Sequence, residues 1–458
     1  MFHSQNLILN TDSYKASHYL QYPKGAEYVS SYIESRGGRY DQTLFFGLQY
    51  YLKAYLSKPI TQADINEAED VLLAHGLVFN RKGWQHILEA HHGIMPVRIQ
   101  AVREGSIIAK RQVMLQMVNT DPQCFWLVNY LETSLLRAIW YPSTVATLSY
   151  HIKKIIRQFL EETADSSDGI LFKLHDFGAR GASSYESAAL GGLAHLVNFL
   201  GTDTTSALVY AREYYHEPMA GFSIPAAEHS TITAWGKANE LQAYENMLDQ
   251  FLGEAKLVAV VSDSYNLWHA LEHLWAEALK GKIIQSKGVV IIRPDSGNPI
   301  EVVCKTLTIL MEKFGYEINS KGYKVLPPYL RVIQGDGISS DSIKAILQQM
   351  KAEGFSADNI AFGMGAELLQ KVNRDTQRFA MKASAICIDG QWQDIYKDPI
   401  TDHQKKSKRG RLALVKEAEV FQTVRLDNLN GRLNYLEPIF EDGHILTEQT
   451  LAEIREMC

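Results

Sequence analysis

Cysteine is scarce in this sequence: four occur among 458 residues, and no two of them form a CxxC pair. This scarcity excludes a disulfide scaffold and a CxxC metal or redox motif, and it favours a reducing compartment. Long apolar runs are also missing, since stretches such as Leu257–Val261 are far too short to cross a membrane. Met1–Asn10 has neither the basic nor the apolar region of a secretory signal. We therefore expect a cytoplasmic protein without a membrane partner.

Positive charge is not in excess either, because 46 Lys and Arg residues face 52 Asp and Glu residues, a formal net charge of −6. Proteins that bind nucleic acid broadly need a basic surface, so we expect no nucleic-acid partner. The GxxxxGK(S/T) phosphate loop and the GxSxG nucleophile motif are both absent. One basic stretch occurs at 405–411, and its composition is compatible with a solvated loop or with a clamp for phosphate oxygens.

Short apolar segments separated by helical stretches dominate the second half of the chain. Continuous apolar strands are typical of parallel sheets buried on both faces, and strand–helix alternation predicts an α/β fold with a (β/α) barrel. The clearest strands are Leu257–Val261, Val289–Ile292, Leu330–Ile333 and Ile360–Phe362. We place a barrel-like domain at 166–389 and a mixed α+β domain at 1–165 with 390–458.

The first part of the chain has a mixed pattern. Apolar periodicity predicts a helix over Asp64–His75, while Val97–Val102 and Met114–Val118 are expected to be strands. The run Cys124–Trp140 is apolar and helical in pattern, and a second helix is expected over Val145–Leu160.

Polar residues and glycines follow the apolar segments of the predicted barrel, where barrel enzymes carry their chemistry. Glycines there let backbone N–H groups approach a phosphate. An Arg can hold a phosphate, and an Asp beside it can accept from ribose hydroxyls or hold Mg²⁺ through water. The alternative for the glycine segments is that they are plain turns between a strand and a helix. The alternative for the Arg and Asp is an ordinary ion pair at the surface. The segments end in Asp176-Phe177-Gly178, Gly201-Thr202-Asp203, Ser262-Asp263-Ser264, Arg293-Pro294-Asp295-Ser296-Gly297, Gly335-Asp336-Gly337 and Gly363-Met364-Gly365.

Two histidine motifs stand apart from those segments. Glu228-His229-Ser230-Thr231 is a compact polar cluster, suited to a His that titrates or is transiently modified. The sequence His269-Ala270-Leu271-Glu272-His273 fits HxxEH, a zinc-ligand pattern that often arises by chance. A solvated helix face is the alternative for the second motif, and we expect no metal held by protein ligands alone.

Eight segments together resemble the nicotinate/quinolinate phosphoribosyltransferase superfamily, and within it the enzymes that use nicotinamide. They are distributed over nearly the whole chain, so the resemblance covers both predicted domains. The segments are TDSYKASHY at 11–19, LHDFGARG at 174–181, HLVNFLGTDT at 195–204, IPAAEHSTITAWG at 224–236, VVSDSYN at 260–266, RPDSGNP at 293–299, IQGDG at 333–337 and KSKRGRL at 406–412.

The resemblance implies an irregular (β/α) barrel of the type II phosphoribosyltransferase kind. It also implies an enzyme of NAD salvage that joins nicotinamide to 5-phosphoribosyl-1-pyrophosphate, giving nicotinamide mononucleotide and pyrophosphate. Mg²⁺ and ATP are the implied cofactors, with ATP acting through a phosphohistidine, and a homodimer with shared active sites is the implied assembly. A nicotinate-preferring transferase and a non-catalytic binding or signalling protein on the same fold remain alternatives.

The resemblance also implies roles for individual residues. Phe177 and Tyr14 would sandwich the pyridine ring, with Tyr14, beside Asp12, coming from the partner subunit. Asp203 would accept a hydrogen bond from the carboxamide, and a buried carboxylate there would repel nicotinate. His229 would be phosphorylated, with Glu228 beside it. The phosphoribosyl, phosphate and ATP contacts would come from Arg180, Arg293, Asp295, Gly335, Asp336, Gly363, Gly365, Arg374, Lys397 and Lys405.

One segment departs from the expected pattern. The family is expected to have a richer glycine run after the strand at 360–362, where this chain has Gly363-Met364-Gly365-Ala366-Glu367. Glu367 is therefore predicted to place a negative charge near the phosphate site.

Overall fold

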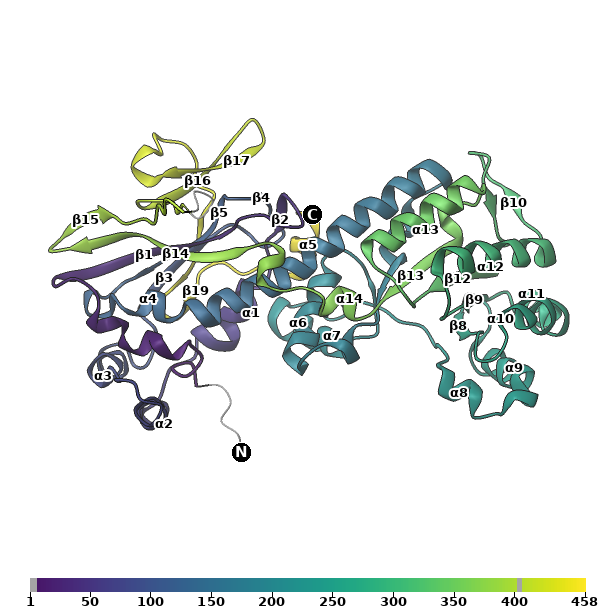
Figure 1. Cartoon of the computed structure of the whole chain (residues 1–458), viewed down its shortest axis with the longest axis horizontal. Coiled ribbons are helices and arrows are strands. Elements are labelled where there is room, and N and C mark those ends of the chain that lie inside the picture. Colours follow the sequence, from purple (N-terminus) through teal and green to yellow (C-terminus); the bar gives the residue numbers. More distant parts are fainter. Residues whose placement is uncertain (1–5, 402–405) are drawn as a thin grey trace. The chain divides into compact units, whose positions relative to one another are not determined.

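The computed structural model describes residues 6–401 and 406–458 (Figure 1). The chain forms two compact units, the first comprising Met1–Thr147, Glu213–Glu217 and Asn373–Cys458, and the second comprising Leu148–Arg212 and Pro218–Val372. The units thus divide the chain at other positions than the predicted boundaries at 165/166 and 389/390. None of the helices in the described residues is both long enough and apolar enough to span a membrane.

The second unit is built on a six-stranded parallel sheet in the order β7-β6-β13-β12-β9-β8. The predicted strands at 257–261, 289–292, 330–333 and 360–362 all belong to it. Its strands are β6 (Leu174–Asp176), β7 (Gly201–Thr202), β8 (Leu257–Val261), β9 (Val289–Arg293), β12 (Leu330–Gln334) and β13 (Ile360–Met364). Val258, Val260, Val290, Ile292 and Val332 are completely buried in them, because both faces of such a sheet are covered.

The segment Phe222–Ala226 links the two edges of this sheet. The Phe222 amide donates to the Leu200 carbonyl at 2.7 Å and its carbonyl accepts from Thr202 at 3.1 Å, beside β7. At the other edge, the Ala259 amide of β8 donates to the Pro225 carbonyl at 3.0 Å. The sheet therefore curls into an irregular barrel, which confirms the predicted fold class.

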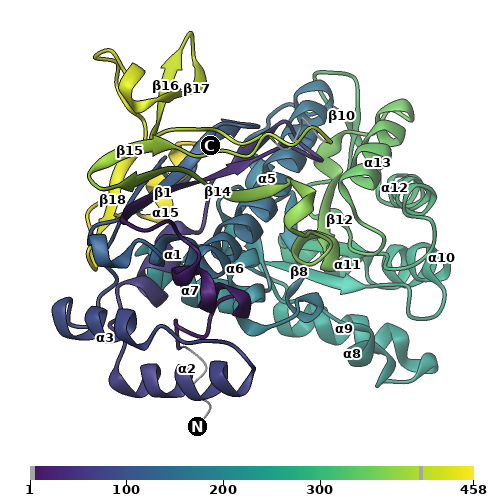
Figure 2. The ribbon, with the colours of Figure 1, turned by 60° about the vertical axis from the view of Figure 1, so that its left-hand side comes forward.

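Helices connect the strands and cover the outside of this sheet, as the turned view shows for α12 and α13 (Figure 2). Their ends follow ordinary capping rules: Asn298 accepts from the Ile300 amide at the start of α12, and Ser339 forms a capping box with Ser342 at the start of α13. The helices are α6 (Tyr185–Leu196), α7 (Thr205–Tyr215), α8 (His229–Thr233), α9 (Glu240–Phe251), α10 (Leu267–His269), the π-helix η7 (Ala270–Ala278), α11 (Lys280–Ser286), α12 (Pro299–Phe314), α13 (Ser340–Ala352) and α14 (Ala366–Leu369). Short 3-10 turns are η4 (Asp168–Phe172), η5 (Ala179–Gly181), η6 (Lys237–Asn239) and η8 (Ala357–Asn359), and β10 (Glu317–Ile318) pairs with β11 (Lys324–Val325).

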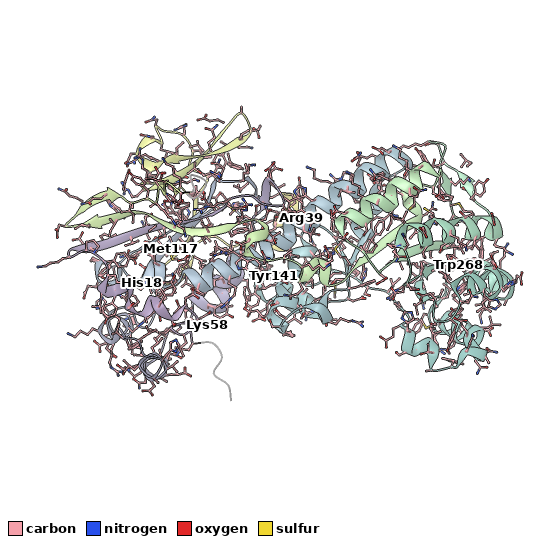
Figure 3. The ribbon with its side chains drawn as sticks, viewed as in Figure 1. His18, Arg39, Lys58, Met117, Tyr141 and Trp268 are labelled. Atoms are coloured by element: carbon pink, nitrogen blue, oxygen red, sulfur yellow. The ribbon has the colours of Figure 1, made fainter. Side chains whose placement is uncertain are left out.

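The first unit contains a seven-stranded antiparallel sheet in the order β15-β14-β1-β5-β3-β18-β19 (Figure 1). Tyr32, Ile33, Ile99, Met117 and Met381 contribute to the core on this sheet, and Met117 of β5 is labelled in Figure 3. The strands are β1 (Ala26–Ser35), β3 (Val97–Ala101), β5 (Val113–Asn119), β14 (Phe379–Ile388), β15 (Gln391–Asp394), β18 (Glu437–Glu441) and β19 (His444–Ile445). Two further pairs are β2 (Gln42–Leu44) with β4 (Ile107–Ala109), and β16 (Leu412–Glu417) with β17 (Val420–Arg425).

The helices of this unit surround the sheet. They include the predicted helix at 64–75, which the structure extends to α2 (Gln62–Ala74) with a Thr61 capping box. The others are η1 (Ser13–Leu20), α1 (Leu48–Tyr51), the π-helix η2 (Leu52–Leu56), α3 (Arg81–Ala90), η3 (Pro122–Cys124), α4 (Leu127–Tyr130), η9 (Arg374–Thr376), η11 (Leu426–Asn428) and α15 (Leu451–Glu456).

Helix α5 (Glu132–Thr163) corrects the prediction of two helices at 124–140 and 145–160. Cys124 ends η3, and one helix then continues through Pro142 to Thr163. Proline removes one amide donor from a helix and usually ends or kinks it. The turn is supported here by Ser143, whose hydroxyl donates to the Phe46 carbonyl at 2.9 Å and accepts from the Phe46 amide at 3.0 Å. Tertiary contacts therefore carry the helix across a residue that the sequence pattern treats as a break.

Candidate active site

The carboxyl ends of the parallel strands gather several of the predicted site residues in the second unit. Phe177 follows β6, Asp203 follows β7, Arg293 ends β9, Gly335 follows β12, and Gly363 lies in β13. Because parallel strands point the same way, their carboxyl ends share one edge of the sheet, where open α/β sheets and barrels bind ligands.

The ring of Phe177 lies directly on Gly363. A Cβ at position 363 would stand only 1.9 Å from Cε2 of the ring, so no side chain fits there without moving it. The backbone of Phe177 is fixed as well, because its amide donates to the Met364 carbonyl at 2.9 Å. The guanidinium of Arg293 lies 5.6 Å from the ring centroid, within cation–π range. The structure thus brings Phe177, Gly363 and Arg293 together, as predicted.

Arg293 and Asp295 form a two-bond ion pair beside that ring. Arg293 Nη2 donates to Asp295 Oδ2 at 2.7 Å, and Nε donates to Oδ1 at 3.2 Å. A Cβ on Gly335 would lie 3.3 Å from Asp295 Oδ1 and 3.5 Å from the Phe177 ring, which places Gly335 against the same group. Asp336 is exposed on the turn that follows, and its carbonyl accepts from Gln334 Nε2 at 2.9 Å.

Asp203 is a partly exposed carboxylate whose hydrogen bonds both fall on one oxygen. His175 Nε2 lies 3.1 Å from Oδ1, and the Ser223 hydroxyl donates to the same atom. Burial raises the pKa of Asp203, but those two hydrogen bonds and the positive charges of His175 and Arg293 outweigh burial, so the net pKa lies below its usual value. The His175 ring is 5.1 Å from the Phe177 ring, so Asp203 and the aromatic group are neighbours. Asp203 is thus ionised, and its Oδ2 carries neither of these bonds.

His229 is held by an aspartate that the sequence reasoning did not assign. Its Nε2 lies 2.9 Å from Oδ1 of Asp263, and its Nδ1 lies 3.9 Å from Oδ2 of Asp295. The Asp263 side chain is 4% exposed, and its Oδ2 accepts from the Asp295 amide at 3.1 Å and from the Ser296 hydroxyl. Since a carboxylate only accepts, Nε2 of His229 carries a proton, so in the neutral tautomer Nδ1 is the nitrogen with the free lone pair.

Glu228 and the exposed Arg180 lie on two different elements of the second unit. Glu228 is the N-cap residue of α8, where its side chain accepts from the Ser230 hydroxyl and its amide donates to Thr231 Oγ1 at 3.2 Å. Arg180 lies on η5, which directly follows Phe177 and Gly178. Glu228 therefore shapes the turn that presents His229.

Glu367 was predicted to place a negative charge near the phosphate site. The structure pairs Glu367 Oε2 with Lys371 Nζ at 2.7 Å, one turn further along the chain. A Cβ on Gly181 would meet the Ala366 methyl at 2.7 Å, so the small residue at 366 allows η5 and α14 to pack closely. The backbone of Gly365 stays open, with the Phe177 carbonyl 3.9 Å from a hypothetical Cβ.

The remaining predicted residues belong to the first unit. The Tyr14 side chain is 57% exposed on η1, with its ring 5.0 Å from that of His18, which Figure 3 labels. Asp12 precedes η1 without capping it, and instead accepts from the Thr133 hydroxyl at 2.7 Å. Arg374 is exposed and pairs with Asp375 at 3.2 Å.

Lys397 is exposed, and its amide donates to Ser407 Oγ at 2.8 Å, which draws the basic segment back onto the chain. Lys405 lies outside the described residues.

Two residues that contact the assigned ones were missed by sequence reasoning: His175 and Ser223. Asp263 was found at the end of a predicted strand but was given no role, and it follows the apolar strand β8 within two residues. His175 points into the site from within β6, and Ser223 belongs to the edge-linking segment, so only the folded chain shows their contact with Asp203.

Comparison with known proteins identifies the family of the chain. The profile of the nicotinate phosphoribosyltransferase (NAPRTase) family matches residues 172–442, and the profile of the nicotinamide phosphoribosyltransferase N-terminal domain matches residues 6–99. The chain is 54% identical over 462 residues to a nicotinamide phosphoribosyltransferase of Xanthomonas campestris, covering 99% of this chain and 98% of that protein. It is 32% identical to a nicotinamide phosphoribosyltransferase of Acinetobacter baylyi, with 97% and 95% covered.

Two solved structures share the fold at low sequence identity. The nicotinate-nucleotide pyrophosphorylase from Pyrococcus furiosus superposes with a TM-score of 0.63 at 16% identity, covering 100% of this chain and 95% of that one. The human nicotinic acid phosphoribosyltransferase superposes with a TM-score of 0.56 at 17% identity, covering 98% and 92%.

Proposed function

This chain belongs to the nicotinamide phosphoribosyltransferases of the nicotinate phosphoribosyltransferase family, and on that premise we propose that it joins nicotinamide to 5-phosphoribosyl-1-pyrophosphate in NAD salvage. It is then a pentosyltransferase. The observation that carries the proposal is the group formed by Phe177 on Gly363, the ion pair of Arg293 with Asp295, and the ionised Asp203. This group combines a flat apolar surface, an acceptor for an amide and a cation for phosphate.

The proposed reaction forms a bond from the pyridine nitrogen to ribose C1 and breaks the bond from C1 to the pyrophosphate oxygen. By analogy with glycoside cleavage, the transition state carries positive charge on the ribose ring. The pyridine nitrogen has no proton to lose, so no general base is needed. The task of the protein is to orient the ring, hold the ribose and stabilise the departing pyrophosphate.

In this proposal Phe177 presents its ring for stacking on the pyridine, and Asp203 Oδ2 accepts from the carboxamide N–H. The bonds from His175 and Ser223 to Asp203 both fall on Oδ1, so the second oxygen is available without breaking either of them. A nicotinate carboxylate at the same place would meet an ionised group with no proton between them. The nearest alternative, a nicotinate-preferring transferase, would require that charge to be neutralised.

We assign Arg293 and Asp295 to the phosphoribosyl group. Arg293 supplies the fork of donors that suits a phosphate, and Asp295 can accept from the ribose hydroxyls. Gly335 and Gly363 leave the backbone accessible at the same edge. Arg180, Asp336, Gly365, Arg374, Lys397 and Lys405 stay assigned to phosphate, pyrophosphate or ATP as predictions.

Mg²⁺ is proposed as a cofactor that arrives with the substrate phosphates. Proteins usually bind Mg²⁺ through one or two carboxylates together with substrate phosphate oxygens. Asp295, Asp336 and Asp263 supply carboxylates of that kind at this edge, so the residues fit the ion. When bound, the ion would neutralise charge on the departing pyrophosphate.

His229 is proposed to take the γ-phosphoryl group of ATP on Nδ1, with ADP as the leaving group. Its Nε2 proton is held by the nearly buried Asp263, which fixes the tautomer and leaves the Nδ1 lone pair as the nucleophile. The 47% exposure of the His229 side chain leaves room for an incoming phosphate. Hydrolysis of the phosphohistidine would then favour product formation.

We further propose a homodimer in which Tyr14 of one subunit completes the stacking site of the other. The exposure of Tyr14 supports this, because an aromatic ring with an exposed face can stack on a planar ligand. A cytoplasmic location stays a prediction from composition.

Product analysis tests the proposal. The purified chain is given Mg²⁺, 5-phosphoribosyl-1-pyrophosphate and either nicotinamide or nicotinate, each with and without ATP. We expect nicotinamide mononucleotide as the main product, with ATP raising its yield in the native chain but not in His229→Ala. Nicotinate mononucleotide as the main product would overturn the assignment of Asp203, and absence of any product would favour a binding protein on this fold.

A further inference from the structure

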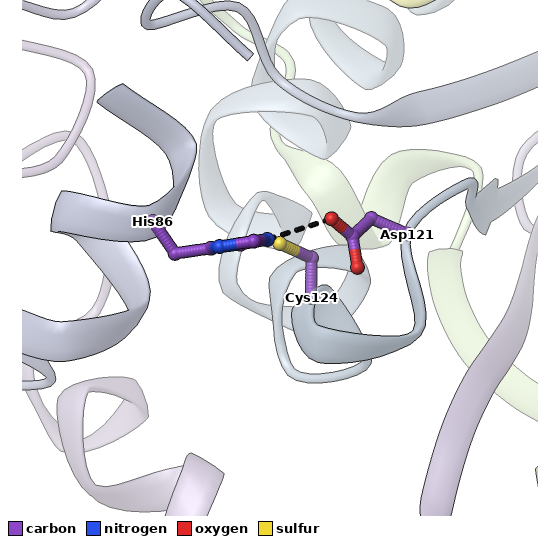
Figure 4. Close-up of side chains that lie close together, drawn as sticks. All are labelled: His86, Asp121 and Cys124. Atoms are coloured by element: carbon purple, nitrogen blue, oxygen red, sulfur yellow. Dashed lines mark hydrogen bonds and ion pairs between the residues drawn. The ribbon is translucent and has the colours of Figure 1, made fainter. Parts of the chain in front are cut away.

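Three side chains of the first unit that the proposed reaction does not use converge at one point, His86, Asp121 and Cys124, and His91 contacts the same carboxylate. His86 Nε2 lies 2.7 Å from Asp121 Oδ2, and His91 Nε2 lies 2.6 Å from the same oxygen. The ligand atoms of His86, Asp121 and Cys124 all lie within 4.8 Å of one another, and Figure 4 shows these three side chains pointing together. An imidazole, a carboxylate and a thiol thus share one location, and a second imidazole adjoins the carboxylate.

The backbone fixes the carboxylate and the thiol in that arrangement. Asp121 is the N-cap residue of η3, and its Oδ1 accepts from the Gln123 amide at 2.7 Å. The Asp121 carbonyl accepts from the Cys124 amide at 2.9 Å and from Asn119 Nδ2 at 2.7 Å. Only Oδ2 of Asp121 is therefore turned toward the two histidines.

Close packing brings the histidines to the same place. His86 lies on α3 and His91 follows its last residue. The Trp84 ring of α3 contacts the Trp126 ring edge-on at a centroid distance of 4.8 Å. A Cβ on Gly83 would stand 2.8 Å from Trp126, which shows how closely the helix lies against the segment after η3. The cluster is therefore part of a packed junction between α3 and η3.

The contacts of Asp121 show how crowded the cluster is. Its Oδ2 holds the Nε2 atoms of His86 and His91 at 2.7 and 2.6 Å, so one carboxylate oxygen contacts two imidazoles at once. The thiol of Cys124 lies in the same group and is fully buried.

We propose that His86, His91, Asp121 and Cys124 bind a divalent transition metal ion of the zinc class. Two imidazole nitrogens, one carboxylate oxygen and one thiolate are a donor set that suits tetrahedral Zn²⁺. On binding, each imidazole proton moves from Nε2 to Nδ1, and the Cys124 thiol proton passes to solvent. The ion then takes the place of the protons that now hold the four groups together.

The distances to Asp121 allow the two imidazoles to become ligands with small movements relative to that carboxylate. In a tetrahedral site with bonds of about 2.0–2.3 Å, neighbouring ligand atoms lie about 3.3–3.7 Å apart. The two imidazoles must therefore draw back from Asp121 by less than about 1 Å. The side chains of His86 and His91 are 24% and 27% exposed, while Cys124 is fully buried. An ion can thus enter from the histidine side and reach the thiol below.

The predicted HxxEH motif provides a contrast within the same chain. His273 Nδ1 lies 3.0 Å from Glu277 Oε2, so this histidine pairs along its own helix. The His269 and His273 rings lie 4.9 Å apart, and in the described residues they form no group with a third potential ligand. Zinc is therefore assigned to the junction of α3 and η3, where it would tie the helix to the segment following β5.

Metal binding to the tag-free full-length chain tests the proposal. After treatment with a chelator, the chain is titrated with Zn²⁺, and bound metal is measured by elemental analysis. We expect one Zn²⁺ per chain and a melting temperature raised by several degrees. With Co²⁺ in place of Zn²⁺, we expect a thiolate-to-metal absorption band that Cys124→Ser removes.

Variants separate this site from other histidines. His86→Gln and His91→Gln should each weaken Zn²⁺ binding at least tenfold, and both positions are partly exposed, so these variants are expected to fold. His273→Gln is the matched control and should leave binding unchanged. The proposal is overturned if the native chain binds no Zn²⁺ at a stoichiometric ratio. It is equally overturned if His273→Gln abolishes binding while His86→Gln and His91→Gln do not.

Discussion

The two oxygens of Asp203 have different surroundings, and this difference bears on which pyridine the enzyme selects. Oδ1 is held by His175 and Ser223, while Oδ2 has neither of these partners. The hydrogen bonds that lower the pKa of Asp203 keep the carboxylate charged near neutral pH. A charged acceptor favours an amide N–H over a carboxylate, because like charges in a partly buried site repel each other.

Asp203→Asn is expected to reduce the preference for nicotinamide over nicotinate. The substitution keeps the shape of the side chain but removes its charge, so the repulsion of nicotinate disappears. We expect the ratio of kcat/KM for the two substrates to fall by about tenfold or more, equivalent to about 1.4 kcal/mol. Steady-state kinetics with each substrate measures this ratio, and the KM for 5-phosphoribosyl-1-pyrophosphate is the internal control. An unchanged ratio would show that Asp203 does not read the amide.

Gly363→Ala is expected to displace the Phe177 ring and weaken nicotinamide binding. The new methyl group would lie 1.9 Å from the ring, and the backbone at 363 has no positive φ that would itself strain alanine. We therefore expect the KM for nicotinamide to rise by about tenfold or more while the chain stays folded, because the stacking surface moves.

Gly281→Ala is the matched control for that change. A Cβ at 281 meets nothing within 4 Å, and the position lies in helix α11, where alanine is favoured over glycine. Kinetics of both variants, with circular dichroism to confirm folding, distinguish a local clash from a general effect of the substitution. Equal kinetics for the two variants would contradict the assigned role of the ring.

Among the elements of the first unit, α1 and the C-terminal segment meet at the buried residue Glu104. The Gln49 amide at the start of α1 donates to Glu104 Oε1 at 2.7 Å. The Glu104 amide donates to Gln449 Oε1 at 2.8 Å, and the Gln449 amide donates to Gln49 Oε1 at 2.8 Å. Burial raises the pKa of Glu104 to about 7, although the hydrogen bond from the Gln49 amide lowers it in part. A titrating carboxyl group thus lies where segments far apart in the sequence meet.

Glu104→Gln is expected to stabilise the protein at pH 8 more than at pH 5. The folded pKa of about 7 lies above the usual 4.5, so the folded chain binds the extra proton between these values. The stability that Glu104 adds to the folded chain is therefore fully present below pH 4.5, and it is lost as the pH rises through about 7. We expect a difference of about 1–3 kcal/mol between the two pH values, seen as melting temperatures of variant and native chain. The exposed Glu89→Gln serves as control, and equal shifts at both pH values would contradict the prediction.

Strands with continuous apolar sequences were predictable, because burial on both faces leaves no room for polar side chains. This explains why β8, β9, β12 and β13 were found within one or two residues of their bounds. The order of these strands and their closure by Phe222–Ala226 were not predictable, since both depend on pairings between distant segments. The continuity of α5 through Pro142 was missed for the same reason, because Ser143 and Phe46 support it from another element.

For the site, the sequence predicted the residues that follow the strands, and the structure groups Phe177, Arg293, Asp295, Gly335 and Gly363. It did not predict which partner orients each one. Asp263 holds His229, and Lys371 balances Glu367, and both contacts follow from how loops and helices pack. The residues that follow a strand can be predicted from the local sequence. Their hydrogen-bond partners cannot, because these come from distant segments that meet only when the chain folds.

At the scale of the whole molecule, the predicted site residues are divided between the two compact units. Phe177, Asp203, His229 and Arg293 belong to the second unit, whereas Tyr14 belongs to the first, together with Arg374 and Lys397. The proposal that Tyr14 serves the partner subunit therefore predicts that neither chain of a dimer has a complete site of its own. Complementation between two inactive variants is the direct test of that arrangement.

Mixed dimers of Tyr14→Ala and Asp295→Ala are expected to regain activity that neither variant has alone. If Tyr14 acts on the partner, a hybrid has one site with both native residues and one site lacking both. Random pairing makes half of the dimers hybrids, so the mixture should show about one quarter of the native activity per chain. Co-expression with two different affinity tags isolates the hybrids, and native mass spectrometry confirms their composition. Purified hybrids without activity would mean that Tyr14 acts within its own chain, because every such hybrid then lacks an intact site, whereas a Tyr14→Ala variant that is active alone would mean that Tyr14 has no role.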